Sequence, residues 1–570
     1  MFQFKKINNL KALVISVIFF ITIIIWTLWQ FRFNYMISMY DSFFHAERIY
    51  EIRLAFQQQT LPAWINYNTF FHTGQAINGM YPDFTLYPFV RLTNFLTPIH
   101  QIIAIKSLII MATYLVSFIT LNKYFDSTNA AFSATIFVLS GGILKDLINE
   151  MQTGTSLAMI VAFPLVFCLK DAVESKKIDF KLILEIALLM TFVVNSHLLS
   201  IVAISMIVGI CWLINLIWKR NFISIVNLGL AALGTIVLSW PIIYRVVKIS
   251  STGLNAPFSQ GRIESYSLFN FLSGAAWNTK NSISYAAILL LALTIIFLNK
   301  KQLTNIVTWF VVEAVIVIFC TNLVPWNLLS NVPIINNFQN SSWRFALYLS
   351  VIPVIIFLIN FHGKRARLIL LLVTILSYGM AFRAAYNAQY QYTAGFPVLT
   401  QYSTEDIPTE GVAKLTSTGI NSDRITRTLI PDYSPATVKV KDNSNGFSFS
   451  DENVETLSHH LAIIDGKKIP MEYSGDSNAT ILTGTNIPKG TVTLPFFYYK
   501  SLNYDVTVNG QKVNIDSSSK GLIKISNKSK QKKLTVKIHQ KLPMTYLLIT
   551  IFLTALYLWG LYVVFGKWNK

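Results

Sequence analysis

Long apolar segments alternate with shorter polar segments along most of the chain. A helix of roughly 20 apolar residues crosses the roughly 30 Å hydrocarbon core of a bilayer. Twelve apolar runs are predicted to do so, at residues 11–31, 101–121, 128–146, 155–169, 182–198, 199–218, 222–244, 282–299, 303–322, 343–361, 367–386 and 543–565. The pattern therefore predicts a polytopic α-helical membrane protein with about twelve transmembrane helices.

Basic residues fall in alternate connecting segments of this pattern. The segments predicted to be cytoplasmic contain Lys123, Lys170, Lys176, Lys177, Lys181, Lys219, Arg220, Lys300, Lys301, Lys364, Arg365 and Arg367. Cytoplasmic loops of membrane proteins are enriched in Lys and Arg, so this distribution predicts that both termini are cytoplasmic. The segments 32–100, 146–154, 245–281, 323–342 and 387–541 then face outward.

Composition narrows the class of protein further. The chain is 53% hydrophobic and 13% charged, and its net charge is +20. Such a charge would indicate nucleic-acid binding in a soluble protein, but the loop distribution accounts for it here, and no nucleic-acid partner is predicted. All three cysteines lie in apolar runs, which argues against a disulfide or a thiolate metal site.

The segment 387–541 differs from the rest because it is polar and its hydrophobic residues alternate with period two. Alternation of this kind is typical of β-strands, and it occurs at 437–441, 491–494 and 533–538. Residues 504–515 predict a hairpin in which Asn509-Gly510 forms the tight turn. The predicted organisation is a membrane domain over 1–386, an extracytoplasmic β-sandwich over 387–541, and a last helix with a cytoplasmic tail over 542–570.

The first outer segment holds the main candidate for catalysis. Asp41 and His45 are four residues apart and would share one helix face at the membrane surface. A carboxylate there could accept a proton from an attacking hydroxyl. Alternatively, Asp41 only caps an interfacial helix, a position that aspartate favours.

The same segment and the next outer turn supply weaker candidates. Tyr81 and Asp83 lie in an aromatic, proline-containing stretch that could stack sugars, although aromatic residues also form belts at the membrane interface. Glu150, in an acidic turn, could hold acceptor hydroxyls or a metal, or it is a solvated loop residue. Whether the protein uses a divalent metal is left open.

Three further basic residues lie at outer helix ends or outer loops. His197 is either a site residue or a hydrogen-bonded helix terminus. Arg344, where an outer loop enters an apolar run, suits a phosphate at headgroup depth, although snorkelling to bulk lipid phosphates would also explain it. Arg262 is a similar but less specific candidate.

Several common reactions lack their usual motifs. The sequence contains no Walker loop, no His-Glu-x-x-His and no Gly-x-Ser-x-Gly. ATP-driven transport, zinc proteolysis and esterase chemistry by those routes therefore have no motif support.

Together, Asp41-x-x-x-His45 followed by Arg48, Tyr81-Pro82, Asn149-Glu150 and Trp343-Arg-Phe345 resemble motifs of YfhO-type membrane proteins and the related 6-pyruvoyl-tetrahydropterin-synthase-related membrane family. The resemblance implies a GT-C-like glycosyltransferase that takes a sugar from a polyprenyl-phosphate donor on the outer leaflet. It matches Asp41 to the family's essential acid and Arg344 to a residue near the lipid phosphate. The acceptor it implies is a cell-envelope polymer such as teichoic acid or polysaccharide.

Two other classes of function remain open. A transporter or flippase of lipid-linked sugars would use polar residues near the bilayer midplane, and Glu185 and Glu313 lie within apolar runs. A non-catalytic envelope assembly protein would act through its β-domain. The Lys- and Asn-rich composition is compatible with a Gram-positive bacterium.

Overall fold

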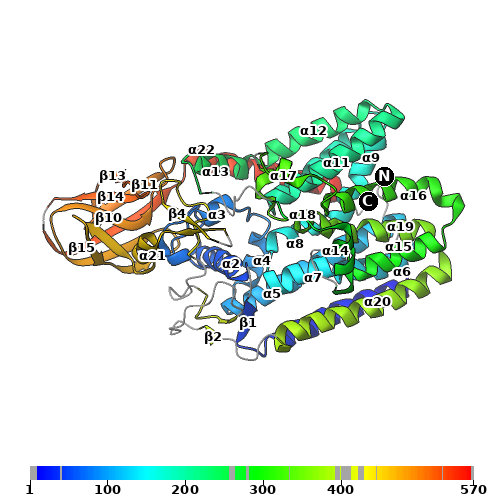
Figure 1. The fold of residues 1–570 in the computed structure, drawn as a ribbon, viewed down its shortest axis with the longest axis horizontal. Coiled ribbons are helices and arrows are strands. Elements are labelled where there is room, and N and C mark those ends of the chain that lie inside the picture. Colours follow the sequence, from blue (N-terminus) through cyan, green and yellow to red (C-terminus); the bar gives the residue numbers. More distant parts are fainter. Residues whose placement is uncertain are drawn as a thin grey trace.

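The computed structural model describes residues 9–38, 41–255, 263–277, 282–332, 334–391, 398–399, 413–420, 429–443, 446–528 and 530–566. Within these ranges the molecule is a helical bundle joined at one end to two β-sheets (Figure 1). Helix α1 begins and helix α22 ends at the opposite end of the bundle.

Seven segments of the described chain are long and apolar enough to cross a membrane. Three of them are single helices: Leu10–Gln30 (α1), Pro98–Tyr124 (α5) and Leu198–Lys219 (α11). The other four segments are Lys300–Phe319, Ser341–Asn360, Gly363–Tyr390 and Met544–Gly566. They contain, in the same order, Leu303–Phe319 (α16), Ser341–Phe345 (α18) with Ile352–Asn360 (α19), Gly363–Tyr386 (α20) and Met544–Leu561 (α22). Two bent pairs pass the same test together: Thr153–Met159 (α8) with Ala162–Glu174 (α9), at 55°, and Ile223–Leu238 (α12) with Trp240–Ser250 (α13), at 67°. Counting each pair as one span gives up to nine spans.

The other three predicted runs form shorter helices. Ser127–Val138 (α6) has 12 residues and is followed by Gly141–Lys145 (α7), Phe180–Val194 (α10) has 15, and Tyr285–Ile296 (α15) has 12. At about 1.5 Å per residue, these helices rise only about 18 to 23 Å, which is less than the roughly 30 Å core. A multi-pass architecture is therefore supported, whereas the number twelve stays a prediction.

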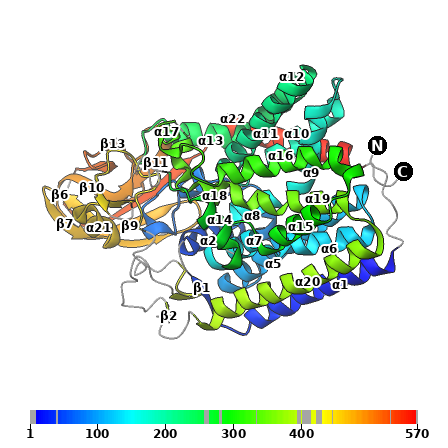
Figure 2. The ribbon, with the colours of Figure 1, turned by 45° about the vertical axis from the view of Figure 1, so that its right-hand side comes forward.

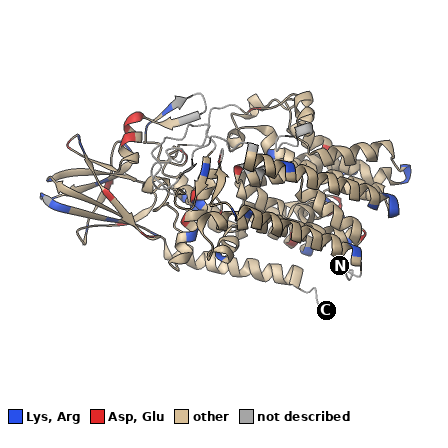
Figure 3. Cartoon of the chain, turned by 90° about the horizontal axis from the view of Figure 1, so that it is seen from below, with Lys and Arg blue, Asp and Glu red and all other residues tan. Residues whose placement is uncertain are grey.

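The bundle is a layered packing of these helices. α1 and α20 run side by side along one edge (Figures 1 and 2), and α22 packs against α10, α12 and α13. Large hydrophobic side chains remain exposed on α1 and α22, as expected for surfaces that face lipid. Lys and Arg gather on loops at the end of the bundle remote from the sheets (Figure 3), the end that the basic-loop rule assigns to the cytoplasm.

A layer of short elements separates the long helices from the sheets. From the first outer segment it contains Tyr35–Ser38 (β1), Ser42–Gln57 (α2), Ile77–Met80 (α3) and Tyr87–Thr93 (α4) (Figure 1). β1 pairs with Ala413–Thr416 (β3), which also pairs with Val398–Leu399 (β2). The N-terminal outer segment and residues far along the chain thus share one small sheet.

Two five-stranded sheets form the β-sandwich. One has the order Ile515–Ser517 (β13), Leu522–Asn527 (β14), Gly490–Phe497 (β10), Leu461–Ile464 (β6), Lys467–Pro470 (β7). The other has the order Gln511–Lys512 (β12), Asn503–Val508 (β11), Gln531–Lys541 (β15), Thr480–Ile487 (β9), Glu472–Gly475 (β8). Alternate residues such as Val492, Leu494, Leu534 and Val536 are fully buried between the sheets, as period-two patterning requires.

The strand predictions at 491–494 and 533–538 are confirmed, because β10 and β15 contain them. The hairpin is also confirmed: Asn509 and Gly510 join β11 to β12 with φ values of 50° and 82°, as a type I′ turn requires. The strand predicted at 437–441 is displaced, since Val440–Asn443 (β4) pairs with Gly446–Phe449 (β5). A helix, Asp451–Ser458 (α21), precedes the first sandwich strand, so the sandwich itself begins only at Leu461. The domain boundary at 387 stays a prediction.

Candidate functional site

The loop that follows α2 fixes the base of the site. Phe70, Phe71 and His72 all adopt positive φ values of 53° to 59°, a costly conformation for side chains of this size. Two buried carboxylates of α2 hold them there: Glu47 accepts from the Phe70 amide at 2.5 Å, and Glu51 accepts from the Thr69 hydroxyl at 2.9 Å. The polar face of α2 therefore organises the loop.

The β-sandwich clamps the same loop from the other side. Phe497 donates its amide hydrogen to the Thr73 carbonyl at 2.8 Å, and Tyr499 accepts from the Ala76 amide at 2.9 Å. Gly74 has a φ of 70°, and a Cβ there would lie 2.1 Å from the Phe496 ring, so only glycine fits. The membrane domain and the sandwich thus meet at this loop.

Asp41 precedes α2, but its side chain makes no capping hydrogen bond to the helix. Instead its Oδ2 accepts from Nε2 of Gln152 at 2.6 Å. Gln152 comes from the turn before α8 and also hydrogen-bonds His45. Because Asp41 is exposed, its carboxylate is open to solvent and to ligands.

His45 and Arg48 occupy the next turn of α2 and are both buried. Nη1 of Arg48 lies 3.1 Å from Nδ1 of His45. A guanidinium can only donate hydrogen bonds, so Nδ1 of His45 is the acceptor and a neutral ring carries its proton on Nε2. Burial, followed by the charge of Arg48 and that of His197, lowers the pKa of His45 well below its usual value.

Tyr81 lies at the centre of the cluster. Its ring stacks under the Arg48 guanidinium, 4.1 Å from centroid to Cζ, and meets the His45 ring edge-on at 5.7 Å. Arg48 also donates to the Pro82 carbonyl at 3.1 Å. Burial raises the pKa of Tyr81, and Arg48 and Arg344 oppose that rise while Asp41 adds to it.

His197 and Arg344 enter from helix ends on the other side. His197 is the residue before α11, and its Nδ1 lies 2.9 Å from the Ser200 hydroxyl. Burial, then the charges of Arg344 and Arg48, lowers the pKa of His197 to about 3, so the ring is neutral. Arg344 is half-buried and donates to the Phe338 carbonyl at 2.9 Å and to Gln339 at 3.1 Å. The cluster thus contains two guanidinium groups, which are suited to binding an anion.

Asp83 is placed differently from the expectation that it contacts substrate. Its Oδ1 forms an ion pair with Arg245 of α13 at 2.8 Å, and both side chains are almost fully buried. Its Oδ2 accepts from the Tyr87 hydroxyl at 3.0 Å. This geometry favours a structural role for Asp83, because its oxygens are engaged in holding α13 against the outer layer.

Two other predicted site residues, Glu150 and Arg262, are not placed in the cluster around Tyr81. Glu150 is half-buried at the end of the turn Asp146–Glu150, two residues before Gln152. In the part of the chain that the structure describes, no group of three or more His, Cys, Asp or Glu residues could hold a metal ion. Arg262 lies outside the described residues.

A residue that the sequence did not single out, Asp432, reaches the cluster from the C-terminal half of the chain. Gln75 donates to the Asp432 carbonyl at 2.6 Å, and Tyr499 donates to the carbonyl of Tyr433, whose φ is 60°. Burial, followed by the charge of Asp41, raises the pKa of Asp432 to about 7. A second carboxyl group therefore faces the Asp41 side of the site. Gln152 was missed as well, because only the fold brings these residues together.

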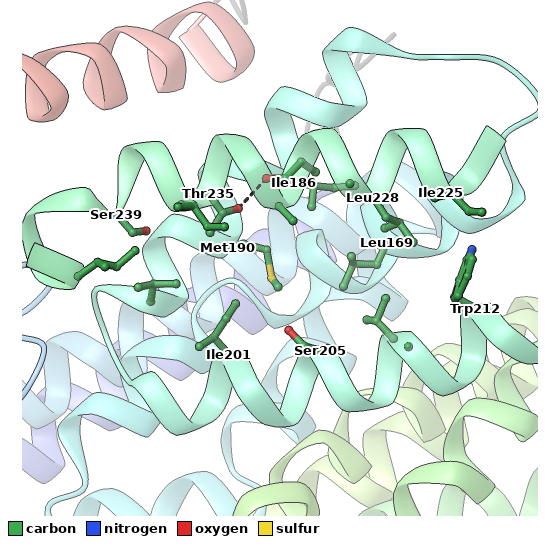
Figure 4. A pocket seen from close by; sticks show the side chains of 18 residues that line it. Leu169, Ile186, Met190, Ile201, Ser205, Trp212, Ile225, Leu228, Thr235 and Ser239 are labelled. Atoms are coloured by element: carbon green, nitrogen blue, oxygen red, sulfur yellow. Dashed lines mark hydrogen bonds between the residues drawn. The ribbon is translucent and has the colours of Figure 1, made fainter. Parts of the chain in front are cut away.

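An apolar groove lies between helices of the bundle (Figure 4). It has a volume of about 520 Å³ and is lined by α9, α10, α11, α12 and the start of α13, within the roughly 300 to 1,000 Å³ typical of ligand pockets. Along α12 it extends from Ile225 to Ser239, about 21 Å at 1.5 Å per residue. Its lining begins on α11 at Ile201, one turn after His197, so one end of the groove reaches the level of the polar cluster.

Two glycines keep the groove open. Gly209 of α11 and Gly229 of α12 both line it, and a Cβ built at either position meets no atom within 4 Å. Larger side chains at these positions would enter the groove.

The acids of the rival transport hypothesis lie apart from this cluster. Glu185 of α10 is buried near Lys181, at 3.7 Å, and near the Cys168 thiol. Glu313 is buried in α16, and in the described part of the structure neither of its oxygens has a hydrogen-bond partner.

Comparison with known proteins assigns no family. No family model matches the chain, and no curated protein matches it significantly.

Proposed function

We propose that the protein is a membrane glycosyltransferase that moves a sugar from a polyprenyl-phosphate donor to a cell-envelope polymer on the outer face of the membrane. The proposal places both termini in the cytoplasm of a Gram-positive bacterium, with about twelve helices crossing the membrane. The observation that carries it is the convergence of an exposed carboxylate, Asp41, with two guanidinium groups around Tyr81, one helical turn of α11 from the start of an apolar groove.

In this mechanism Asp41 accepts the proton of an acceptor hydroxyl. The hydroxyl oxygen attacks the anomeric carbon, and the bond between that carbon and the phosphate oxygen breaks, so the phosphate leaves with the electron pair. Arg344 and Arg48 stabilise the charge that develops on the phosphate, one of the larger contributions to catalysis. Gln152, which also hydrogen-bonds His45, orients the carboxylate.

The groove provides a place for the hydrocarbon chain of the donor. A chain lying between α11 and α12 would bring its phosphate to the level of His197 and the arginines. The proposal therefore links the two sites: the groove selects the lipid, and the polar cluster performs the transfer.

The test reconstitutes the purified protein with radiolabelled polyprenyl-phosphate sugar and an envelope polymer acceptor. A transferase converts label from the organic phase into a water-soluble polymer. A transporter leaves the label on lipid and only changes its leaflet. An assembly protein does neither, and either of those two results would refute the proposal.

Leucine substitutions test the groove in the same assay. Gly229→Leu and Gly209→Leu place a side chain in the open groove and remove room for the lipid chain, so the KM for the lipid donor should rise about tenfold, which corresponds to about 1.4 kcal/mol of lost binding. The matched control is Gly379→Leu in α20, where an added Cβ also meets no atom within 4 Å but which does not line the groove. Equal KM values for all three variants would remove the groove from the donor site.

A further inference from the structure

The end of the β-sandwich farthest from the helices carries a cluster of lysines (Figure 3). β15 runs for 11 residues from Gln531 to Lys541 and then leads into α22. At about 3.3 Å per residue, its first residue lies up to roughly 33 Å along the strand from its last, which leads into the membrane helix. The turns at this far end therefore project away from the bilayer.

Strand pairing brings three turns together there. Gly490 pairs with Asn527, and Gln531 pairs with Ile487, so the β9–β10 and β14–β15 turns are neighbours. The Asn527 side chain locks them by donating to the Pro488 carbonyl at 2.7 Å. The β6–β7 turn joins them, because Asp465 lies against Gly490.

We call these six exposed residues the lysine tip: Lys467, Lys489, Lys528, Lys530, Lys532 and Lys533. Asp465 is the acid that the pairing places beside them, so the tip is strongly positive. Among the ion pairs between described residues, none involves these six side chains.

The sides of the same domain are different. There five lysines are each paired with an acid: Lys441 with Asp451, Lys468 with Glu455, Lys512 with Asp505, Lys520 with Glu452, and Lys524 with Asp516. Four other exposed lysines of this domain, Lys439, Lys500, Lys537 and Lys541, also form no ion pair among the described residues. The tip differs because six lysines gather there beside one acid, whereas most lysines elsewhere in the domain have an acid close by. Self-repulsion of such a cluster is unfavourable, and an anionic ligand would relieve it.

We propose that the lysine tip binds a linear polymer of phosphodiesters outside the cell. Lysine is a flexible point charge without the planar fork of arginine, which suits many interchangeable phosphates rather than one fixed group. A polymer held at the tip stays near the molecule while its hydroxyl groups search for the Asp41 site. Only this last step, in which the polymer is the acceptor, rests on the proposed function.

The experiment measures binding to the full-length protein in nanodiscs, with fluorescent poly(glycerol phosphate) as the probe and uncharged dextran as the reference. The tip variant changes Lys489, Lys528, Lys530, Lys532 and Lys533 to Gln. The control variant changes five exposed lysines at the other end of the bundle to Gln, namely Lys176, Lys177, Lys300, Lys301 and Lys364. Both variants lose the same net charge.

The wild type should bind the phosphate polymer and not dextran, and its affinity should fall at least about tenfold between 50 and 200 mM salt, as expected when several counterions are released. The tip variant should bind at least about tenfold more weakly at low salt, with a shallower salt dependence, whereas the control variant should match the wild type. Equal losses in both variants would show only an effect of net charge, and an unchanged tip variant would place the polymer elsewhere; both results overturn the inference. The inference would also be overturned if the wild type bound anionic vesicles but not the polymer, and the tip variant lost the binding to vesicles.

Two further measurements separate folding and catalysis from binding. An unchanged thermal unfolding midpoint for the tip variant shows that loss of binding is not loss of fold. Asp41→Asn should bind the polymer as the wild type does, so failure of transfer and failure of tip binding are distinguishable.

Discussion

Asp41 and Asp83 come from the same outer segment, one before and one after Tyr81 in the sequence, yet their surroundings differ. Asp41 is exposed and accepts a hydrogen bond from an amide. Asp83 is buried in an ion pair with Arg245 and holds α13 in place. The comparison teaches that aromatic neighbours do not identify a catalytic carboxylate. Accessibility distinguishes Asp41, the carboxylate that we propose as the base, from Asp83, whose oxygens are used in an ion pair and a hydrogen bond.

The largest expected effect on activity is that of Asp41→Asn, which tests whether Asp41 acts as the base. An amide cannot accept the proton, and loss of a general base commonly lowers the rate about 10²-fold to 10⁴-fold. Transfer by the purified variant should fall by that amount, measured as kcat with saturating donor. The Asp41 side chain caps no helix amide, so the unfolding midpoint should not change. A normal rate would remove Asp41 from catalysis and leave Asp432 as the next carboxyl group to test.

Asp83→Asn should act on stability instead. It leaves the Arg245 guanidinium buried without its counter-charge, and breaking a buried ion pair from one side costs about 3 to 5 kcal/mol. Unfolding of the purified protein, followed by denaturant titration in detergent, should show that loss. The double variant Asp83→Asn with Arg245→Met should recover part of it, since the unpaired charge is gone. If stability is unchanged while transfer fails, Asp83 belongs to the site after all.

Arg344→Lys tests whether the arginine in the Asp41 cluster contributes to transfer. The charge remains, but the fork that donates to Phe338 and Gln339 is lost, and one charged hydrogen bond is worth about 1.5 kcal/mol or more. We expect about a tenfold fall in kcat with a smaller change in the KM for donor. Arg383→Lys, an exposed arginine of α20, is the matched control and should leave both constants unchanged.

A fourth test concerns Asp432 and the pH dependence of stability. Its pKa is raised to about 7 in the folded protein, whereas an unfolded aspartate has a pKa near 3.9. Between those values the folded state binds more protons at Asp432 than the unfolded state does, so the contribution of this carboxyl group to stability falls as pH rises from about 4 to 7. The unfolding midpoint of Asp432→Asn should depend less on pH across that window than the midpoint of the wild type. Parallel curves would mean that the carboxyl group is not buried in solution.

The sequence predicted features that depend on local pattern. The alternating residues of β10 and β15 and the Asn509-Gly510 turn needed no knowledge of distant contacts, and the long apolar runs of α1, α5 and α11 are helices of the expected length. Length was harder to judge where apolar residues continue past a helix end, as in α10 and α15.

The site was predicted only in part, for a physical reason. Asp41, His45 and Tyr81 lie in one segment and share recognisable spacing, and the structure places Arg344 and His197 with them. Gln152 and Asp432 join through contacts over more than 100 residues of chain, so no local pattern marks them. Asp83 could not be separated from Asp41 because its partner, Arg245, is distant in sequence.

The contact between α22 and helices that are synthesised earlier, α10, α12 and α13, has a consequence for synthesis. Gly560 lies so close to α10 that a Cβ would approach Leu188 to 3.0 Å. These two residues are 560 − 188 = 372 positions apart, and at about 5 to 20 residues per second the ribosome needs roughly 20 to 75 s between them. For that time α10, α12 and α13 lack the helix that covers them, and the β-sandwich is made in the interval. Until the last helix is made, this face of the bundle lacks its protein partner, and a chain that ends within the sandwich would keep the face exposed to lipid permanently.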